Sequence, residues 1–154
     1  MVKDLSPKEI DLCSDAVDSY ACLCLRRASR AVTQCCDEIL KPTGMRCTQL
    51  VILLTIPLLK NPSIVELAAA LLMDRSTLTR NLRPLQKNNL VKIEEGEDRR
   101  KKVIRLTKKG RNKVKIGLPV CEKYHKKLVK KIGAKRWGEV MQCLDEIVEA
   151  IQHF

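Results

Sequence analysis

The chain has 154 residues, of which 45% are apolar and 31% are charged. This length suits one domain, or one small domain with an oligomerisation element, and argues against a multi-domain enzyme. The composition is that of a folded globular protein and excludes wholesale disorder and a collagen-like chain. Thirty Lys and Arg against eighteen Asp and Glu give a net charge of +12.

The positive charge is concentrated in one stretch. Residues 75–136 contain 22 basic and 5 acidic side chains, whereas the rest of the chain contains 8 basic and 13 acidic ones. Such a segment binds polyanions because it displaces their condensed counterions. We therefore expect a nucleic acid or an anionic surface as partner. The simpler alternative is a solvated basic face that binds nothing specific.

The sequence shows no targeting signal. The longest apolar stretch, residues 50–59, has about half of the ~20 residues that a membrane helix needs, and Pro57 interrupts it. Residues 1–7 lack the charged start and apolar block of a secretory signal. The cytoplasm is the expected compartment.

Eight cysteines are present, and a reducing compartment predicts free thiols, most of them buried. There is no Cys-x-x-Cys, and His125 and His153 stand alone, so a structural zinc site is not expected. We also find no Ser/His/Asp set, no carboxylate pair and no Gly-rich phosphate loop. Neither catalysis nor a cofactor is expected.

Helices are expected before residue 60. Residues 8–40 contain no Gly or Pro, and their apolar positions recur at steps of three and four, which predicts one or two helices with a buried face. Pro42 and Gly44 then interrupt the chain. Residues 48–59 predict an apolar helix that Pro57 kinks or ends.

Two short helices across a tight turn are predicted next, which is the arrangement of a helix-turn-helix. Ser63 and Glu66 have the spacing of a capping box before an apolar run, and Asp74 can cap a second helix that reaches Lys87.

The second of these helices has two distinct faces. Leu78, Leu82 and Leu85 recur at helical spacing and predict a buried stripe, and Pro84 predicts a bend near the last turn. Polar side chains that could enter a DNA major groove lie on the opposite side, at Ser76, Arg80, Arg83 and Lys87.

A basic hairpin and two further helices complete the chain. Residues 90–94 and 103–107 predict strands, and the segment between them includes four consecutive basic residues, 99–102. Such a hairpin beside a helix-turn-helix is typical of a wing that reaches phosphates or the minor groove. Thr107 can cap a long helix to about residue 131, bent near residues 117–119. Residues 137–151 then form an apolar stripe that needs a partner.

Three segments within residues 48–111 carry recognisable motifs. Residues 74–80 read Asp-Arg-Ser-Thr-Leu-Thr-Arg, residues 89–91 read Asn-Leu-Val, and residues 98–100 and 106–111 read Asp-Arg-Arg and Leu-Thr-x-x-Gly-Arg. In this order they resemble the MarR family of bacterial winged-helix regulators. The chain departs from the family pattern at Arg46, where a capping Thr is common, at Asn89, where the family has Gly, and at Pro84 inside the recognition helix.

The resemblance implies a mainly α fold with a small β wing, namely a winged helix-turn-helix domain with N- and C-terminal dimerisation helices. It implies six helices and a sheet of two or three strands. We expect one domain over residues 1–154, with the DNA-binding part at 45–107 and helical dimerisation parts at 8–40 and 108–154.

The resemblance also implies a function. The expected protein is a dimeric, sequence-specific, DNA-binding transcription regulator of the bacterial cytoplasm, most often a repressor in this family, released by a small phenolic or other apolar effector. Its partners would be double-stranded DNA with a near-palindromic operator and a second copy of the chain. The expected DNA contacts are Arg75, Ser76, Thr77, Thr79, Arg80, Arg83, Lys87, Arg99, Arg100 and Lys101.

A narrower resemblance concerns one cysteine. Residues 22–31, Cys-Leu-Cys-Leu-Arg-Arg-Ala-Ser-Arg-Ala, are similar to the first helix of the family's organic-hydroperoxide sensors, whose reactive cysteine falls at Cys22. By analogy with two-cysteine sensors, Cys121 would be its disulfide partner. The tyrosines that hold the thiolate in such sensors are not matched, and only Tyr20 lies nearby. The alternative for Cys22 is a buried structural cysteine.

Two other classes of function remain to be weighed. A basic RNA-binding module would need exposed rings for stacking, and only 3% of the residues are aromatic. A thiol peroxidase would turn over peroxide. Comparing the affinity for duplex DNA with the affinity for single-stranded RNA of equal length distinguishes a DNA regulator from an RNA-binding module. A peroxide-turnover assay would reveal a thiol peroxidase.

Overall fold

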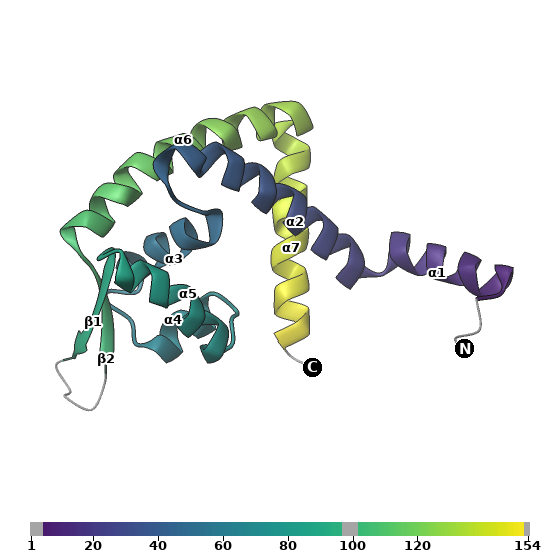
Figure 1. Cartoon of the computed structure of the whole chain (residues 1–154). Helices are drawn as coiled ribbons and strands as arrows, with labels where there is room; N and C mark the ends of the chain where they lie inside the picture. Colours follow the sequence, from purple (N-terminus) through teal and green to yellow (C-terminus); the bar gives the residue numbers. More distant parts are fainter. Residues whose placement is uncertain (1–4, 97–101, 153–154) are drawn as a thin grey trace.

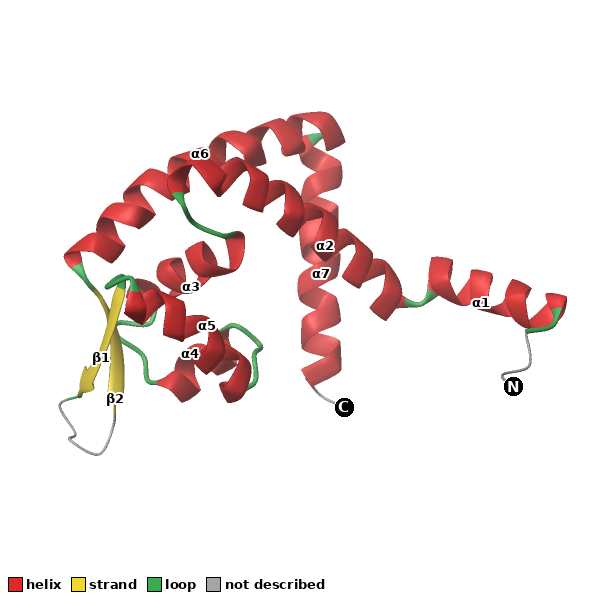
Figure 2. Cartoon of the chain, in the orientation of Figure 1, coloured by secondary structure: helices red, strands yellow, loops and turns green. Residues whose placement is uncertain are grey.

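The computed structural model describes residues 5–96 and 102–152, in which α-helices predominate (Figures 1 and 2). Within these residues the elements are α1 (Pro7–Ser19), α2 (Ala21–Leu40), a 3-10 turn (Lys41–Thr43), α3 (Cys47–Leu58), α4 (Ile64–Ala70), α5 (Arg75–Lys87), β1 (Val91–Glu95), β2 (Lys102–Leu106), α6 (Lys108–Ile132) and α7 (Ala134–Gln152). Of the described helices, none is long and apolar enough to cross a membrane.

These elements form a winged helix-turn-helix unit flanked by long helices. Helices α3, α4 and α5 and the β1–β2 hairpin make the winged unit, while α2 and α6 lie side by side above it (Figure 1). Helix α7 returns from the end of α6, and α1 extends away from the rest of the molecule. The predicted mainly α fold with a small β wing is confirmed.

The predicted helix starts are confirmed by their capping contacts. The Ser63 hydroxyl accepts a hydrogen bond from the Glu66 backbone N–H at 3.2 Å. Thr107 Oγ1 accepts one from the Gly110 N–H at 3.0 Å, at the start of α6. Each cap satisfies a backbone donor that has no partner within its own helix.

Two predictions about helix boundaries had different outcomes. Helix α3 ends at Leu58, directly after Pro57, as expected. Residues 8–40, predicted as one or two helices, form two, because Tyr20 has an extended backbone (φ −74°, ψ 121°) between α1 and α2, and the implied count of six helices is wrong. The described residues therefore contain seven α-helices. No Gly or Pro marks this break, so the sequence did not give its position.

Strands β1 and β2 pair antiparallel, with Val91 opposite Leu106 and Ile93 opposite Ile104. A third segment joins this ladder at one point: Ser63 bridges to Val103, and the Ile104 N–H donates to the Pro62 carbonyl at 2.8 Å. The hairpin is thus fastened to the loop before α4. This places the wing directly beside the helix-turn-helix.

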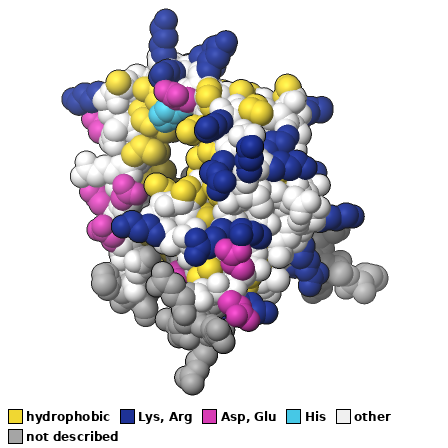
Figure 3. Space-filling view, turned by 90° about the vertical axis from the view of Figure 1, so that its left-hand side faces the viewer, with side chains coloured by type: hydrophobic (Ala, Val, Ile, Leu, Met, Phe, Trp, Pro, Cys, Tyr) yellow, Lys and Arg dark blue, Asp and Glu magenta, His cyan; other side chains and the backbone are white. Residues whose placement is uncertain are grey.

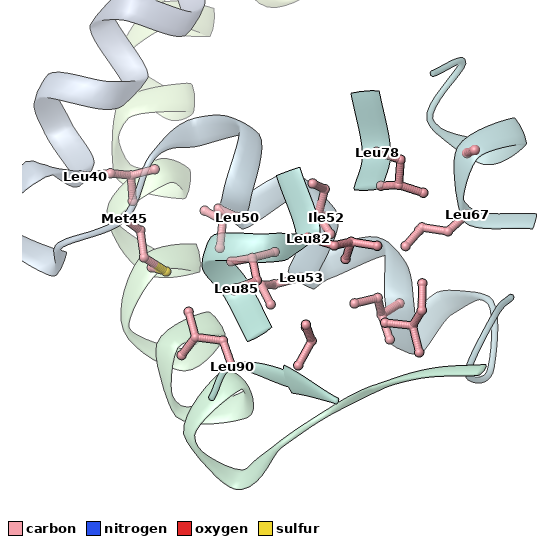
Figure 4. Close-up of a cluster of buried hydrophobic side chains, with 14 residues drawn as sticks. Leu40, Met45, Leu50, Ile52, Leu53, Leu67, Leu78, Leu82, Leu85 and Leu90 are labelled. Atoms are coloured by element: carbon pink, nitrogen blue, oxygen red, sulfur yellow. The ribbon is translucent and has the colours of Figure 1, made fainter. Parts of the chain in front are cut away.

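The hydrophobic core lies inside the winged unit (Figure 4). Leu78, Leu82 and Leu85 of α5 are at most 1% exposed and pack among apolar side chains of α3, α4 and the sheet. Leu40 at the end of α2 and Met45 extend this cluster toward α6. Burial of such side chains is the main source of stability in a domain of this size.

Helix α6 approaches the winged unit closely at two glycines. A Cβ on Gly110 would lie 2.0 Å from the Leu90 carbonyl oxygen, and a Cβ on Gly117 would lie 2.5 Å from Met45 Cε. At Gly110 the obstacle is backbone, which leaves no room for a methyl group, whereas at Gly117 the Met45 side chain would have to move. These glycines therefore allow α6, which is continuous and curved in Figure 1, to pack against Leu90, the residue before β1, and against the core.

We predict that Gly110→Ala destabilises the protein by about 1–3 kcal/mol, because the methyl group must displace backbone rather than a flexible side chain. Urea unfolding measures the change. Gly138→Ala on α7 is the matched control, since a Cβ there meets no atom within 4 Å. That substitution should stabilise by roughly 0.5–1 kcal/mol through helix propensity. Equal stability of Gly110→Ala and the parent would contradict the close approach.

Candidate nucleic-acid interface

The N-terminus of α5 is fixed by Asp74. Its Oδ1 accepts hydrogen bonds from the Ser76 hydroxyl at 2.5 Å and from the Thr77 backbone N–H at 2.7 Å. These two contacts, that of Ser76 first, hold the pKa of the exposed Asp74 carboxyl far below its usual range. The carboxylate is therefore ionised at neutral pH and also matches the positive end of the helix dipole.

The two sides of helix α5 carry different kinds of side chain. The leucine stripe is buried in the core, whereas the basic side is exposed. Five of the seven predicted contacts on this helix line one open surface depression of about 450 Å³: Arg75, Ser76, Thr79, Arg80 and Arg83. The structure therefore brings together, on one surface, side chains that can donate hydrogen bonds to base edges and phosphates.

The other two predicted contacts of α5 are placed differently. Thr77 is half-buried, and its Oγ1 accepts a hydrogen bond from Arg80 Nη2 at 3.0 Å. Its side chain thus orients a guanidinium. Lys87 is exposed in the last turn but lies outside the depression. Pro84 does not stop the helix, which continues to Lys87.

The chain leaves α5 through a left-handed residue. Asn89 has φ 55°, and the following Leu90 N–H donates to the Leu85 carbonyl at 2.8 Å. Only Gly, and less readily Asn, adopts this conformation at low cost, so Asn89 fulfils the role of the family's Gly. Thr107 Oγ1 also donates to the Asn89 carbonyl at 2.6 Å. This departure from the family pattern therefore preserves the turn into the wing.

The wing strands carry ion pairs of their own. Glu94 Oε2 lies 2.5 Å from Lys92 Nζ, and Glu94 Oε1 lies 2.8 Å from Arg105 Nε. These charges are partly exposed, so each pair contributes little to stability. The predicted wing contacts Arg99, Arg100 and Lys101 lie outside the described residues.

A second basic site, which the sequence pattern does not reveal, lies at the junction of the winged unit and α6. An open pocket of about 370 Å³ has an apolar lining that includes Ile56 and Leu106, and three cationic side chains stand around it. These are Arg105, Arg111 and Lys115. They come from β2 and from the first turns of α6, and their convergence depends on how α6 packs against α3 and β2, which the sequence pattern does not show. Figure 3 shows Lys and Arg side chains flanking an apolar hollow on the face that includes the wing.

The prediction that most cysteines are buried is wrong for this chain. None of the eight is fully buried; Cys13, Cys22, Cys35 and Cys143 are exposed. The reason is that they lie on helices whose apolar faces the single chain does not cover. Among the described residues there is no group of three or more ligating side chains that could hold a metal ion.

The two redox candidates lie apart within one chain. Cys22 is exposed near the start of α2, whereas Cys121 on α6 lies beside Cys36, with 3.7 Å between the sulfur atoms. Cys22 and Cys36 are fourteen residues apart on one continuous helix, which is about 21 Å along its axis. A Cys22–Cys121 disulfide would therefore have to join two chains.

Comparison with known proteins agrees with the fold. The sequence model of the MarR family matches residues 47–102. The M. tuberculosis transcriptional regulator MosR, solved in complex with DNA, is 33% identical, with a TM-score of 0.78 over 86% of this chain and 96% of that one. The chain belongs to the MarR family.

More distant members share the fold. A mutant of E. coli MarR, complexed with operator DNA, is 20% identical, with a TM-score of 0.77 over 86% of this chain and 96% of that one. S. aureus MepR, in a complex with DNA, is 18% identical, with a TM-score of 0.75 over 87% and 98% of the two chains. Among curated protein sequences, none matches the chain.

Proposed function

We propose that this MarR-family protein is a transcription regulator of the bacterial cytoplasm that binds double-stranded DNA sequence-specifically, with α5 in the major groove and the wing on the backbone or minor groove. The observation that carries the proposal is the two-faced α5. Its leucines are held in the core, so its arginines and hydroxyls must project together from the surface. A helix that displays such donors from a rigid unit can read base edges.

The charge distribution and the relatives support this proposal. The excess of basic side chains lies in residues 75–136, which include α5, the wing and α6. Such a surface gains affinity by releasing counterions from DNA. MosR, with 33% identity over most of both chains, was solved in complex with DNA.

Arg80 is expected to contact bases, because it lies in the depression on α5 and is oriented by Thr77. Arg80→Ala should narrow the difference in binding free energy between operator and random DNA by about 1–3 kcal/mol. Fluorescence anisotropy with both duplexes measures this, using an operator selected from genomic fragments.

Two variants provide the comparison. Arg100→Ala should weaken binding to both duplexes alike, as a backbone contact does. Lys127→Ala, at an exposed position on α6, should leave the ratio of operator affinity to random-DNA affinity unchanged. If Arg80→Ala also lowered both affinities equally, Arg80 would be a backbone contact only. Stronger binding of the parent to single-stranded RNA of equal length would favour the RNA-binding alternative.

We further propose that the protein acts as a homodimer on a near-palindromic operator. The single chain leaves the apolar side chains of the terminal helices largely uncovered: among the described side chains of α1 and α7 none is fully buried, although Trp137 of α7 contacts the His125 ring. Large apolar side chains are exposed on these helices, among them Ile10, Leu12, Val140 and Ile151. A second copy would cover them and would place two recognition helices about 34–36 Å apart, one helical turn of DNA.

Val140→Glu tests the dimer. A charge in this apolar stripe would have to be buried in the interface, so the variant should be monomeric and lose tight operator binding. Sedimentation velocity and anisotropy measure the two effects. Gln142→Lys is the control, because residue 142 is exposed on the opposite side of α7 and a lysine keeps an attractive contact with Glu146, which now accepts a hydrogen bond from Gln142. A monomeric variant that still bound the operator tightly would overturn this proposal.

We also propose that the regulator is a repressor, and that a small anion with an apolar body, such as an aromatic carboxylate, releases it from DNA. The pocket between α3, β2 and α6 supports this proposal, since its volume of about 370 Å³ and its apolar lining suit an aromatic ring, and its cations suit a carboxylate. Such a ligand would touch both the winged unit and α6.

Calorimetry with benzoate and with the neutral benzamide tests the effector site. Benzoate should bind the parent more tightly, and Lys115→Ala should reduce this preference, because Lys115 stands at the pocket but is not in the core. Lys127→Ala again serves as the control. Equal binding of benzoate and benzamide would exclude an anion site.

A further inference from the structure

Three cysteines from three helices meet where α2, α3 and α6 come together; we call them the thiol cluster (Cys36, Cys47 and Cys121). The sulfur atoms of Cys36 and Cys121 lie 3.7 Å apart, although 85 positions separate them in sequence. Cys47, the first residue of α3, has a side-chain hydrogen bond with Cys36. All three are partly exposed, so a small oxidant can reach them.

The backbones that carry the cluster are held in place. The Cys47 N–H donates to Asp37 Oδ1 at 2.6 Å, which fastens the start of α3 to α2. Tyr124, one turn after Cys121 on α6, is hydrogen-bonded to Cys35 on α2. One contact therefore joins α3 to α2 and the other joins α6 to α2, next to the Cys36–Cys121 approach.

The surroundings distinguish the three thiols. Burial, followed by interaction with Cys36, raises the pKa of Cys47 to about 12 and that of Cys121 to about 11. Both therefore remain protonated at neutral pH and can donate S–H hydrogen bonds. Cys36 contacts both of the other thiols, so we assign it as the sulfur that reacts first and Cys121, whose sulfur lies 3.7 Å away, as the one that resolves it.

We propose that Cys36 and Cys121 are an oxidisable pair that closes to a disulfide within one chain and joins α2 to α6. With a hydroperoxide as oxidant, the Cys36 thiolate attacks the terminal oxygen. A sulfur–oxygen bond forms, the O–O bond breaks, and the leaving alkoxide takes up a proton to give an alcohol. The Cys121 sulfur then attacks the sulfenic sulfur of Cys36, and the hydroxyl group leaves with the Cys121 proton as water. Two thiols are oxidised and one hydroperoxide is reduced.

Bond formation has a mechanical consequence. The two sulfur atoms must approach from 3.7 Å to about 2.05 Å. Gly117, one turn before Cys121, packs so closely on the core that a Cβ there would lie 2.5 Å from Met45 Cε and 3.3 Å from Leu50 Cδ1. A shift of α6 is therefore transmitted to the winged unit. If the proposed DNA-binding function holds, operator affinity should fall tenfold or more on oxidation.

Peptide mapping tests the site without reference to DNA. Trypsin leaves Cys36 in the peptide 31–46, Cys47 in 47–60 and Cys121 in 116–123. The full-length protein is treated with cumene hydroperoxide, alkylated and digested without reduction. We expect peptides 31–46 and 116–123 to be linked and the protein to run at monomer mass on a non-reducing gel. Cys36→Ser and Cys121→Ser should lose this link, while Cys35→Ser, Cys22→Ser and Cys143→Ser should keep it.

Each other result would overturn the assignment. A dimer-mass band linked through Cys22 would show pairing between chains, and a link of 31–46 to 47–60 in the parent would make Cys47 the resolving thiol. Absence of any link, or persistence of the 31–46 to 116–123 link in Cys36→Ser, would exclude the pair. Melting curves of the reduced variants verify that they fold, and Cys121→Ala provides a second resolving-site variant.

Operator binding is measured separately on the same samples. Loss of affinity that dithiothreitol reverses, and that Cys121→Ser lacks, supports the mechanical consequence. If the parent forms the Cys36–Cys121 disulfide but binds the operator with unchanged affinity, the mechanical consequence is wrong. The assignment of the disulfide site would still hold. A reduced parent that binds no DNA would contradict the proposed function, and the peptide map would still decide the site.

Discussion

Burial of the α5 leucine stripe is the constraint on which the rest of the molecule depends. Leu78, Leu82 and Leu85 are held in the core by α3, α4 and the sheet, so the rotation of α5 about its axis is determined. At 3.6 residues per turn, that rotation places Arg80 and Arg83 outside together. A change of this rotation would expose leucines and bury guanidiniums, both at high cost. The display of the basic surface is therefore a consequence of core packing.

Local patterns in the sequence were sufficient to predict the helices and strands of the winged unit. The caps at Ser63, Asp74 and Thr107 and the leucine period of α5 depend on neighbours within a few residues, which a sequence shows directly. The left-handed Asn89 is of the same kind, since the turn that follows α5 requires it. The MarR resemblance added the order of these elements and their DNA-binding role.

Contacts between segments far apart in the sequence could not be predicted from such local patterns. The Cys36–Cys121 approach and the pocket at Lys115 depend on where α6 crosses the winged unit, and no periodicity encodes that crossing. The break at Tyr20 lacks a Gly or Pro signal. The exposure of the cysteines was also misjudged, because helical periodicity predicts that a face is covered but does not say whether the same chain covers it.

Helix α6 connects the regions that we assign to sensing and to DNA binding. Its first turns form one side of the anion pocket, its Gly110 lies against Leu90, its Gly117 lies against the core, and its Cys121 faces α2. A packed core resists continuous deformation, so a displacement at any of these points moves the helix as a unit relative to the winged unit. A ligand in the pocket and a disulfide at the thiol cluster would thus act on the same joint, and neither needs to touch the DNA-binding face of α5 to alter how it meets the groove.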